Sequence, residues 1–431
     1  MNEVKELMGL KEHKISVLSV REENLNKEKI KVITIIGNVK KVKCPICSKY
    51  TSSVHDKLKP MKIKFLKMAE QKVIILLIKR RFICHNCKKK ITEELNINKH
   101  KSTISNKLEL KVRKDLLNYN LSIKYIAEEN NISDVEVRNI LLDAMHDYPD
   151  NVKTLPQVIS IDEFAAHTSY DKYALIINDP IKKKTLDILP NRKKDYLMGY
   201  LTKVENRGNV KYVIGDMYEP YLLVTKAMFK NAKYVVDRFH YVRYIMDAID
   251  GIRKRLQKDY GYNSREYRML KNKKNIGLLR KRSNDIDWYV YIKRKEKGKD
   301  VYKMTKTILN EILEISDELD RGYDLKELFL DIIDNSTYET AKEDLMVWID
   351  LCQNSGIYEF IEASKTIENW LEYIVNSFID KRYSNAYTEG LNNKIKVIKR
   401  NGFGYKNFEF FRLRLLYILN GKVSGRSKND K

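Results

Sequence analysis

The spacing of hydrophobic residues changes along the chain and divides it into regions. Residues 1 to about 95 contain short runs rich in β-branched residues, such as 32–36 and 73–78, and these runs predict strands. From about 104 to 147 the apolar residues follow helical spacing. We therefore expect a β-rich domain over residues 1–95 and a helical domain over residues 96–150.

Residues 158–237 show a second pattern, in which three strand-like segments precede alternating helices and strands. The strand-like segments are VISIDEFA, YALIIN and KTLDIL. The helical segments KDYLMGYLTKV and YLLVTKAMFK then alternate with the strands VKYVIGD and KYVVD. This order predicts an α/β domain with a mixed sheet, which we place over residues 151–245.

The sequence after Pro220 contains no proline, and long amphipathic segments occupy it. In TKTILNEILEISDELD and TIENWLEYIVNSFI, apolar residues recur at i, i+3, i+4 and i+7, the period of a helix buried on one side. We expect an all-helical segment over residues 246–375, then further helices and a frayed basic tail over residues 376–431. The whole chain is thus predicted to be a multidomain α+β protein.

Composition adds a strong positive charge. The 83 basic and 58 acidic residues give a net charge of +25. Lys, Asn and Ile are abundant throughout the chain, as in proteins from genomes rich in A and T, so part of the lysine excess reflects composition. A field of this sign still attracts phosphate backbones. Charge alone therefore leaves a nucleic-acid-binding protein and a basic housekeeping protein as alternatives.

Several classes of protein are excluded. No apolar run approaches the ~20 residues of a membrane helix, since the longest covers only residues 73–78. The first residues lack the apolar stretch and cleavage site of a signal peptide. Five cysteines in 431 residues do not form a disulfide scaffold. We expect a soluble cytoplasmic protein with no membrane partner.

Two Cys-x-x-Cys knuckles predict a metal site. Cys44 and Cys47 form the first knuckle, and Cys84 and Cys87 form the second. Four thiolates in two such pairs suit a tetrahedral, closed, structural Zn²⁺ site within a ribbon of strands. His85 is an alternative ligand, and four unrelated buried thiols are the alternative to a metal site. The two symmetric pairs favour four cysteines.

The segment SIKYIAEENNISDVEVRNILLDA, from Ser122 to Ala144, has the layout of a helix-turn-helix. Residues 130–132 suit a turn between two short helices, and Ser133 suits the N-cap of the second helix. In this motif the second helix enters the major groove of DNA. An ordinary helical hairpin is the alternative, because the turn lacks glycine. The residues expected to face the groove are Asn131, Ser133, Asp134, Glu136 and Arg138.

Acidic residues follow or end apolar strands. Asp162 ends the run 158–162, with Glu163 on the opposite face, and Asp216 ends the run 213–216. A carboxylate in such a place is costly to desolvate unless it is paired, hydrated or bound to metal. Two of them on neighbouring strands suit Mg²⁺, which prefers oxygen ligands. A strand-capping aspartate without a ligand is the alternative at each position.

A predicted helix begins near Glu389 in the segment EGLNNKIKVIKR. Glu389, Asn393 and Lys396 are spaced so that an acid, an amide and a base share one face. The apolar residues Leu391 and Ile395, together with Ile398, form the buried stripe. A basic edge for phosphates consists of Lys394, Lys396, Lys399 and Arg400. A solvated basic helix is an equally good interpretation of this segment alone.

Taken together, these motifs resemble one family. The resemblance rests on IDEFA around Asp162, GDMYEPYL around Asp216, VVDRFHYVR around Asp237, and EGLNNKIKVIKRNGFGYKNFEFFRLRLL from Glu389. The order of cysteine knuckles, helical DNA-binding segment and acidic motifs agrees with it. The chain resembles the DDE transposases of bacterial insertion sequences, specifically the ISL3 family.

The resemblance implies a ribonuclease H-like core over residues 151–245 and 376–431, interrupted by the helical insertion 246–375. It implies that Asp162, Asp216 and Glu389 form a catalytic triad. The triad would bind two Mg²⁺ or Mn²⁺ ions, which assist hydrolysis at the element end and transfer of the new 3′-hydroxyl to target DNA.

The resemblance also implies partners and further site residues. The implied partners are double-stranded DNA, as element terminal repeats and as target, and a second copy of the chain in a homodimer or larger synaptic assembly. Lys396 and Arg400 are expected to hold phosphates, while His240 and Arg238 are expected to line the site. The bacterial cytoplasm, at the nucleoid, is the implied location.

Two other functions and one other triad stay open. A DNA-binding regulator derived from a transposase shares the zinc ribbon and helix-turn-helix, and a structure-specific nuclease shares the ribonuclease H-like core. Asp237 is a rival to Glu389 as the third acid, because it also ends an apolar strand. The longer side chain of Glu389, on a helix across the sheet, favours Glu389.

Overall fold

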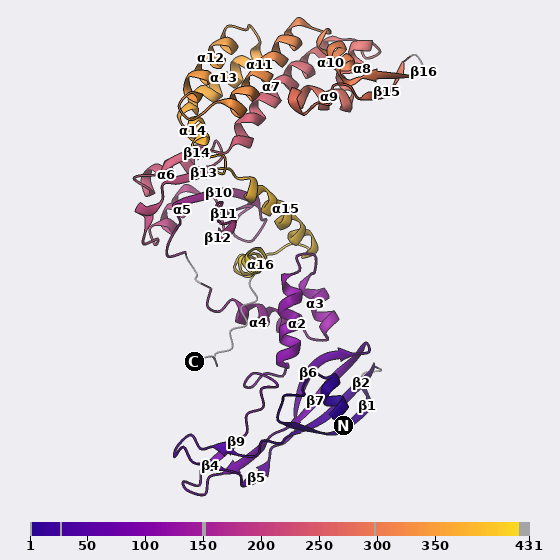
Figure 1. Cartoon of the computed structure of the whole chain (residues 1–431), viewed down its shortest axis with the longest axis vertical. Helices are drawn as coiled ribbons and strands as arrows, with labels where there is room; N and C mark the ends of the chain where they lie inside the picture. The colour runs from indigo at the N-terminus through magenta and orange to yellow at the C-terminus, as the bar shows by residue number, and fades with distance from the viewer. Residues whose placement is uncertain (1, 26–27, 149–151, 297–298, 422–431) are drawn as a thin grey trace. The chain divides into compact units, whose positions relative to one another are not determined.

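The computed structural model describes residues 2–25, 28–148, 152–296 and 299–421 (Figure 1). The chain forms two compact units. The first consists of Met1–Tyr148 with Lys394–Lys431, and the second of Pro149–Asn393. The basic tail predicted at the end of the chain lies outside the described residues.

The first unit contains a four-stranded sheet in the order β1-β2-β7-β6. Helix α1 (Asn2–Leu7) precedes the strands β1 (Ile15–Leu25), β2 (Glu28–Gly37), β6 (Met61–Met68) and β7 (Gln71–Ile78). Strands β2 and β7 are parallel, and the other pairs are antiparallel. Alternate residues of β7 are buried, namely Val73, Ile75 and Leu77. Period-two burial of this kind is what fixes the register of a sheet.

Five short strands surround the cysteine knuckles. They are β3 (Val42–Lys43), β4 (Tyr50–Thr51), β5 (Val54–Lys57), β8 (Arg80–Ile83) and β9 (Lys90–Thr92). β3 pairs with β4, and β8 lies between β5 and β9. The buried carboxylate of Glu93 accepts hydrogen bonds from the backbone N–H and the guanidinium of Arg80, with Nη2 3.0 Å from Oε2. This paired charge fixes β8 beneath the second knuckle.

Three helices and the C-terminal helix complete the first unit. They are α2 (Asn106–Leu117), α3 (Ile123–Asn130), α4 (Asp134–Ala144) and α16 (Phe408–Asn420). Asn131 has φ +53° and ends α3, while Ser133 and Glu136 form a capping box that begins α4. These are the helix boundaries that the sequence indicates for residues 122–144.

Helix α16 packs against α2 and α4 and is held there by buried hydrogen bonds. The guanidinium of Arg414 donates to the carbonyls of Leu116 and Leu121. The hydroxyl of Tyr417 donates to the carbonyl of Arg113 at 2.9 Å. The sequence grouped the segment 376–431 with the α/β core, whereas its residues from 394 onward belong to the first unit.

The second unit contains a five-stranded mixed sheet in the order β12-β11-β10-β13-β14, as the strand pattern predicts. Its strands are β10 (Val158–Ala165), β11 (Tyr173–Asp179), β12 (Lys184–Leu189), β13 (Tyr212–Gly215) and β14 (Lys233–Val236), with α5 (Lys194–Leu201), η1 (Arg207–Asn209) and α6 (Glu219–Met228) between them. β10, β11 and β12 are antiparallel neighbours. β13 and β14 run parallel to β10, so their C-terminal ends meet at one edge of the sheet.

Helices occupy most of the chain between β14 and the last part of this unit (Figure 1). They are α7 (Arg238–Asp259), α8 (Arg265–Lys271), α9 (Lys273–Arg280), η2 (Ser283–Asp285), α10 (Thr305–Leu313), α11 (Asp317–Asn335), α12 (Ala341–Gln353), α13 (Tyr358–Asn369), α14 (Leu371–Val375) and η3 (Asn376–Phe378). Trp348, Phe329 and Cys352 are fully buried at their centre. Helix α15 (Ala386–Asn401) then follows.

The expectation of an all-helical segment over 246–375 is wrong at one place. Strands β15 (Tyr291–Glu296) and β16 (Lys299–Met304) form an antiparallel hairpin. Aromatic and β-branched residues here, such as Tyr291, Ile292 and Val301, favour the pleated backbone. The absence of proline permits a helix but does not exclude a strand.

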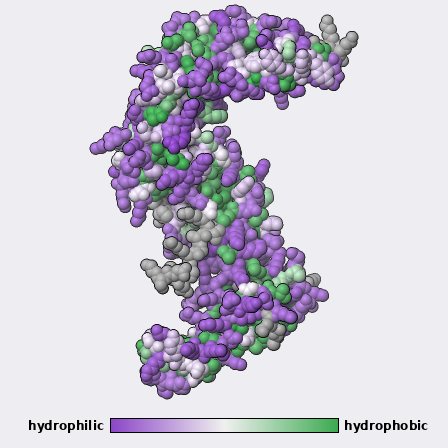
Figure 2. Space-filling model, in the orientation of Figure 1, coloured by the Kyte–Doolittle hydropathy of each residue, from purple (hydrophilic) through white to green (hydrophobic). Residues whose placement is uncertain are grey.

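No helix in the described part of the chain combines the length and apolar character needed to cross a membrane. The face of the molecule visible in Figure 2 is mostly hydrophilic, with apolar residues in patches between polar ones. Both observations agree with the absence of a long apolar run in the sequence.

Candidate active site and metal centre

The two cysteine knuckles have the same local geometry. Cys44 begins a tight turn in which the N–H of Ser48 donates to its carbonyl at 3.0 Å. Cys84 begins an equivalent turn, closed by the N–H of Lys88 at 2.9 Å. Ser48 and Lys88 have φ of +58° and +57°. Each turn therefore aims the backbone N–H groups of its own residues at the first sulfur.

The four sulfurs of the two knuckles lie close together. The Sγ atoms of Cys44, Cys47, Cys84 and Cys87 all lie within 4.8 Å of one another. A backbone hydrogen bond from Cys47 lowers the pKa of Cys44 to about 6, and the corresponding bond from Cys87 lowers the pKa of Cys84. The side chain of His85 instead contacts Ser53. Lowered thiol pKa values favour the thiolates that bind zinc, so this is a four-cysteine Zn²⁺ site.

Three aspartates lie on three adjacent strands of the mixed sheet: Asp162 within β10, where it extends past β13, and Asp216 and Asp237 directly after β13 and β14. Ser160 of β10 pairs with Ile214 of β13, so Asp162 and Asp216 each lie two residues beyond that pair. Gly215 of β13 pairs with Val236 of β14, which places Asp237 at the same level. The C-terminal edge of the sheet thus carries the acids that the sequence singled out.

A cavity of about 630 Å³ brings these acids together with the start of α15. Asp162, Asp216, Asp237 and Glu389 all line it. Arg238 and His240, expected to be near the site, also line it. His240 Nε2 lies 4.0 Å from Asp237 Oδ2. Glu389 is exposed, because it lies in the first turn of α15.

Burial raises the pKa of Asp162 and that of Asp216 to about 6 each. The charge of Asp216 contributes to the shift at Asp162, and that of Glu163 contributes to the shift at Asp216. In the described residues, Asp216 Oδ1 is buried and has no hydrogen-bond partner. Buried carboxylates that repel one another, such as Asp162 and the partly unpaired Asp216, are stabilised by a cation. Oxygen donors of this kind fit Mg²⁺ or Mn²⁺.

The acids are less closely gathered than the cysteines. Among the described residues, the four cysteines are the only set of three or more His, Cys, Asp or Glu side chains with ligand atoms within 4.8 Å of one another. Asp162, Asp216 and Glu389 share a cavity without meeting that distance. These acids come from three separate segments of the chain, whereas the cysteines come from two short turns.

Polar residues near the start of α15 attach it to the strands that carry the acids. Asn392 Nδ2 donates to Asp162 Oδ2 at 2.9 Å, and the backbone N–H of Asn385 donates to Asp237 Oδ1 at 2.8 Å. The hydroxyl of Thr388 is buried and accepts from Asn178 Nδ2 at 2.9 Å. Sequence analysis did not select these residues. Asn385, Thr388 and Asn392 are three and four positions apart, so they share the face of the helix next to Glu389. This spacing is the sequence signal that could have identified them.

Glu163 has its own partners beside the acids. The hydroxyl of Tyr221 donates to Glu163 Oε2 at 2.8 Å, and Arg192 forms an ion pair with Glu163. The guanidinium of Arg192 also lies 4.7 Å from the ring of Tyr173 and 5.2 Å from that of Tyr218. Glu163 is thus a paired carboxylate, in contrast to Asp216.

The residues predicted to bind DNA all lie in the first unit. Ser133 caps α4, and the guanidinium of Arg138 lies 4.4 Å from the ring of Phe410 on α16. The basic edge of α15 consists of Lys394, Lys396, Lys399 and Arg400, of which Lys399 is partly buried and the others are exposed. Burial lowers the pKa of Lys399.

Comparison with known proteins identifies the class and the family. A model of the DDE transposases of the ISL3 group, described as "Transposase", matches residues 159–415. A second model, the "zinc-finger of transposase IS204/IS1001/IS1096/IS1165", matches residues 40–87 and contains both knuckles. This chain belongs to the ISL3 family of transposases, which confirms the resemblance seen in its motifs.

Two curated proteins are similar to parts of the chain. The "Transposase for insertion sequence element IS1001" of Bordetella parapertussis is 26% identical over 262 residues, which cover 60% of this chain and 60% of that protein. An "ATP-dependent protease" of Lactococcus lactis subsp. lactis is 34% identical over 119 residues, or 27% of this chain and 36% of that protein. The chain thus matches about three fifths of the length of the first relative and about one third of the length of the second.

Proposed function

We propose that this protein is the transposase of an insertion sequence, which binds the ends of its element, cuts the DNA there and joins the cut end to target DNA. The observation that carries the proposal is the cavity at the edge of the mixed sheet. Asp162 and Asp216 line it from adjacent strands, and Glu389 lines it from α15. Family membership supports the same activity.

The sheet supports a ribonuclease H-like core. Three antiparallel strands followed by two parallel ones, in the order β12-β11-β10-β13-β14, place the first strand at the centre. Asp162 lies on the central strand just beyond its pairing with β13, and Asp216 directly follows β13, so both acids lie near the edge where ligands bind in open α/β sheets. The helical segment between β14 and α15 is then an insertion into this core.

The site residues take separate roles in the proposal. Asp162, Asp216 and Glu389 hold the divalent metal ions. When bound, Mg²⁺ or Mn²⁺ stabilises charge on the phosphate and on the attacking and leaving oxygens. Asn392 positions the carboxylate of Asp162 through its hydrogen bond. Thr388 and Asn385 fix α15 against the sheet, so that Glu389 stays at the cavity.

Two displacements at phosphorus use the same residues. In the first, water attacks the phosphodiester at the element end, the P–O bond to the 3′ oxygen breaks, and a 3′-hydroxyl and a 5′-phosphate result. In the second, that hydroxyl attacks a target phosphodiester, and one P–O bond forms as another breaks. Neither step needs a nucleotide energy source, since each exchanges one phosphodiester bond or hydrolyses it.

The first unit supplies recognition of the element ends in this proposal. The capped helix α4 and the left-handed turn at Asn131 support a helix-turn-helix in this proposal. The zinc ribbon adds a second contact, and the basic edge of α15 contacts phosphates. Two ends have to be joined in one reaction, so the active form is a homodimer or larger assembly.

The test uses the full-length chain, Mg²⁺, a linear DNA that carries the inverted repeats flanking the gene, and a supercoiled plasmid as target. We expect 3′-hydroxyl ends at the repeat boundary and joined products in the plasmid, both absent with Asp162→Asn. Cutting without joining would establish the nuclease alternative instead. Specific binding without cutting would establish the regulator alternative.

A further inference from the structure

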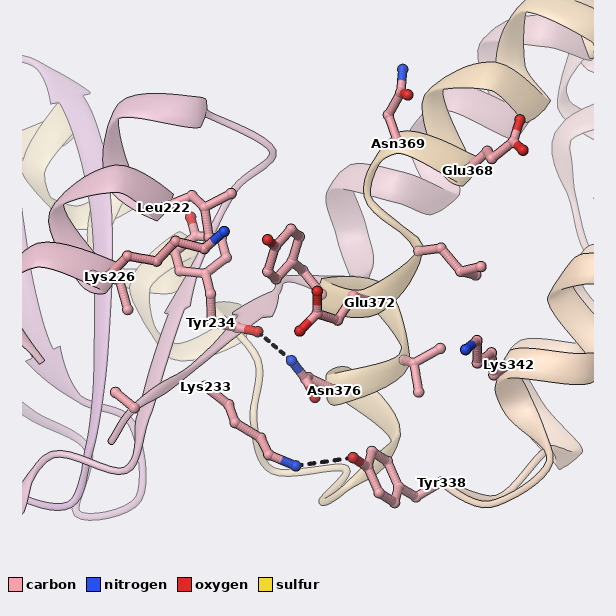
Figure 3. Close-up of a pocket in the computed structure, with 15 residues that line it drawn as sticks. Leu222, Lys226, Lys233, Tyr234, Tyr338, Lys342, Glu368, Asn369, Glu372 and Asn376 are labelled. Carbon is pink, nitrogen blue, oxygen red and sulfur yellow. Dashed lines mark hydrogen bonds between the residues drawn. The ribbon is translucent and has the colours of Figure 1, made fainter. Parts of the chain in front are cut away.

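A second cavity of about 630 Å³ lies in the second unit, away from the acidic one (Figure 3). Its walls come from α6, the edge strand β14, the connection between α11 and α12, and the segment from α13 to η3. Three lysines from three different elements line it: Lys226 on α6, Lys233 on β14 and Lys342 on α12. The fold thus brings Lys342 to two lysines that lie more than a hundred positions earlier in the sequence.

Two of these lysines, Lys226 and Lys233, contact aromatic residues. Lys233 Nζ donates to the hydroxyl of Tyr338 at 3.0 Å and lies 5.2 Å from the centre of its ring. Lys226 Nζ lies 5.3 Å from the ring of Tyr373. Among the described residues, none of the three lysines forms an ion pair with a carboxylate. Their positive charges are therefore available to a ligand.

Both tyrosines keep their lysines charged. The hydrogen bond with Tyr373 raises the pKa of Lys226, and the hydrogen bond with Tyr338 raises the pKa of Lys233. Like charges that face one cavity repel, and an anion in the cavity relieves that repulsion. The aromatic partners fix the direction of each ammonium without neutralising it.

Two carboxylates also line the cavity, and they limit which anions it accepts. Figure 3 shows Glu368 at the rim, pointing away, and Glu372 near the centre, beside the hydrogen bond between Asn376 and Tyr234. A compact polyanion at the centre meets the charge of Glu372. An extended chain with one charge per phosphate can instead place separate phosphates at Lys226, Lys233 and Lys342 around that carboxylate.

The cavity shares a wall with the acidic site. Asn376 lines this cavity and donates to the carbonyl of Tyr234 at 2.8 Å, while its neighbour Ser377 lines the acidic cavity. The hydroxyl of Tyr234, in turn, donates to the backbone carbonyl of Asp216 at 2.7 Å. A strand of DNA held here is thus linked through one side chain to the backbone of Asp216, a residue of the proposed triad.

We propose that the cavity lined by Lys226, Lys233 and Lys342 is a binding site for the phosphodiester backbone of DNA, outside the phosphate that is cut. This inference rests on the proposed function for its choice of nucleic acid. The three lysines contact phosphates, and Tyr338 and Tyr373 present their rings to the sugar. The contact carries no base specificity, because it reads only the backbone.

The test measures binding of a fluorescein-labelled DNA duplex to full-length protein over a range of salt concentrations, without divalent metal. The triple variant Lys226→Gln, Lys233→Gln, Lys342→Gln removes three cations. We expect the slope of log affinity against log salt to fall by about 2 to 3, since each phosphate contact contributes about 0.9. Glu372→Gln should change the affinity in the opposite direction and strengthen binding.

A second triple variant is the matched control. Lys203, Lys273 and Lys306 are exposed in the same unit and line neither cavity. Their replacement by Gln makes the same change in net charge, and we expect the salt slope to stay as in the unchanged protein. Equal losses in both triple variants would show a general charge effect and overturn the proposal. So would an unchanged slope in the first triple variant together with an unchanged affinity in Glu372→Gln.

Binding and cutting can fail separately. If the protein cuts and joins DNA, but the first triple variant has the salt slope of the unchanged protein, this inference is contradicted and the proposed function is not. A protein that never cuts DNA, but whose salt slope falls only in the first triple variant, contradicts the proposed function. That result would still support the DNA-binding site in this cavity. If inorganic phosphate competed with DNA while the lysine substitutions left DNA binding unchanged, the cavity would be assigned to free anions and the proposal overturned.

Discussion

The zinc knuckles and the acidic cavity, which we propose to bind divalent metal, are assembled in different ways. The cysteines come from two tight turns, and their sulfurs lie within 4.8 Å of one another. The acids come from β10, from the ends of β13 and β14, and from α15, and they share a cavity at larger separations. Backbone N–H groups lower the pKa of Cys44, whereas burial raises that of Asp162. The cysteine site is closed, whereas the acidic site is an open cavity, as the proposed binding of ions and substrate requires.

The largest expected effect is loss of the closed site. Replacing Cys84 by Ser removes a zinc ligand, and structural zinc contributes about 10 kcal/mol or more to the folding of small zinc domains. We expect zinc content, measured by elemental analysis, to fall from one ion per chain to none and binding to element ends to be lost. Cys352→Ala is the matched control, since Cys352 is buried in the second unit. Unaltered end binding by a zinc-free protein would contradict a structural role.

The open site should respond in the reverse manner, with chemistry lost and folding kept. Asp162→Asn, Asp216→Asn and Glu389→Gln each remove a ligand charge at nearly constant shape. We expect each to reduce cleavage by about 1000-fold or more, the scale of groups that act in the transition state. Binding to element ends, measured by gel shift, should not change. Cleavage at the normal rate by Glu389→Gln would remove that residue from the triad.

The same contrast explains what the sequence could predict. Both knuckles depend on residues within one turn, so their spacing was sufficient to identify the zinc site. The strands that carry Asp162 and Asp216 could be recognised from their apolar runs, and they are indeed neighbours. The hairpin β15–β16 was not predicted, because the absence of proline is compatible with a strand as well as with a helix.

Contacts between distant segments could not be predicted. The packing of α16 depends on hydrogen bonds from Arg414 and Tyr417 to backbone carbonyls about 300 positions earlier. The hydrogen bond from Asn392 to Asp162 depends on which face of α15 meets the sheet. Local patterns give the faces of a helix but not the partner of each face.

The raised pKa values predict how stability depends on pH. Asp162 and Asp216 have a pKa of about 6 in the folded protein and lower values when unfolded. The folded state therefore holds protons that the unfolded state has released, and stability is lost as pH rises from about 4 to about 6. A pKa difference of about two corresponds to about 3 kcal/mol for each group, as an upper bound.

Tryptophan fluorescence measures this effect in the second unit, because Trp288, Trp348 and Trp370 all lie there. Without divalent metal, urea unfolding should show a more stable unit at pH 5 than at pH 7. Adding Mg²⁺ should restore stability at pH 7 and have less effect at pH 5. The double variant Asp162→Asn, Asp216→Asn should lose most of this dependence. The same pH dependence in that double variant would attribute it to other groups.

A smaller effect is expected at Asn392, which touches a carboxylate of the open site without being one. Asn392→Ala removes the hydrogen bond to Asp162, and loss of such a supporting contact costs about 10- to 100-fold in activity. The bond favours the ionised carboxylate, so the acidic limb of the rate profile should move to higher pH. Asn335→Ala is the control, because Asn335 makes an equivalent bond to Asp331 on exposed α11. A lower rate without any shift of the pH profile would indicate only a packing defect.

The smallest effect is expected at Asp237, the rival to Glu389. Asp237 is buried, and its Oδ1 accepts a hydrogen bond from the backbone N–H of Asn385. Asn in place of Asp keeps an oxygen for that bond, so Asp237→Asn should keep α15 attached and lower cleavage by only about tenfold, as for a residue that supports a metal ligand. Single-turnover cleavage and Mn²⁺ affinity, measured for Asp237→Asn and Glu389→Gln together, decide between the two acids. If Asp237→Asn were inert and lost Mn²⁺ while Glu389→Gln retained both, the third ligand would come from the strand ends, and the open site would be built wholly at the edge of the sheet.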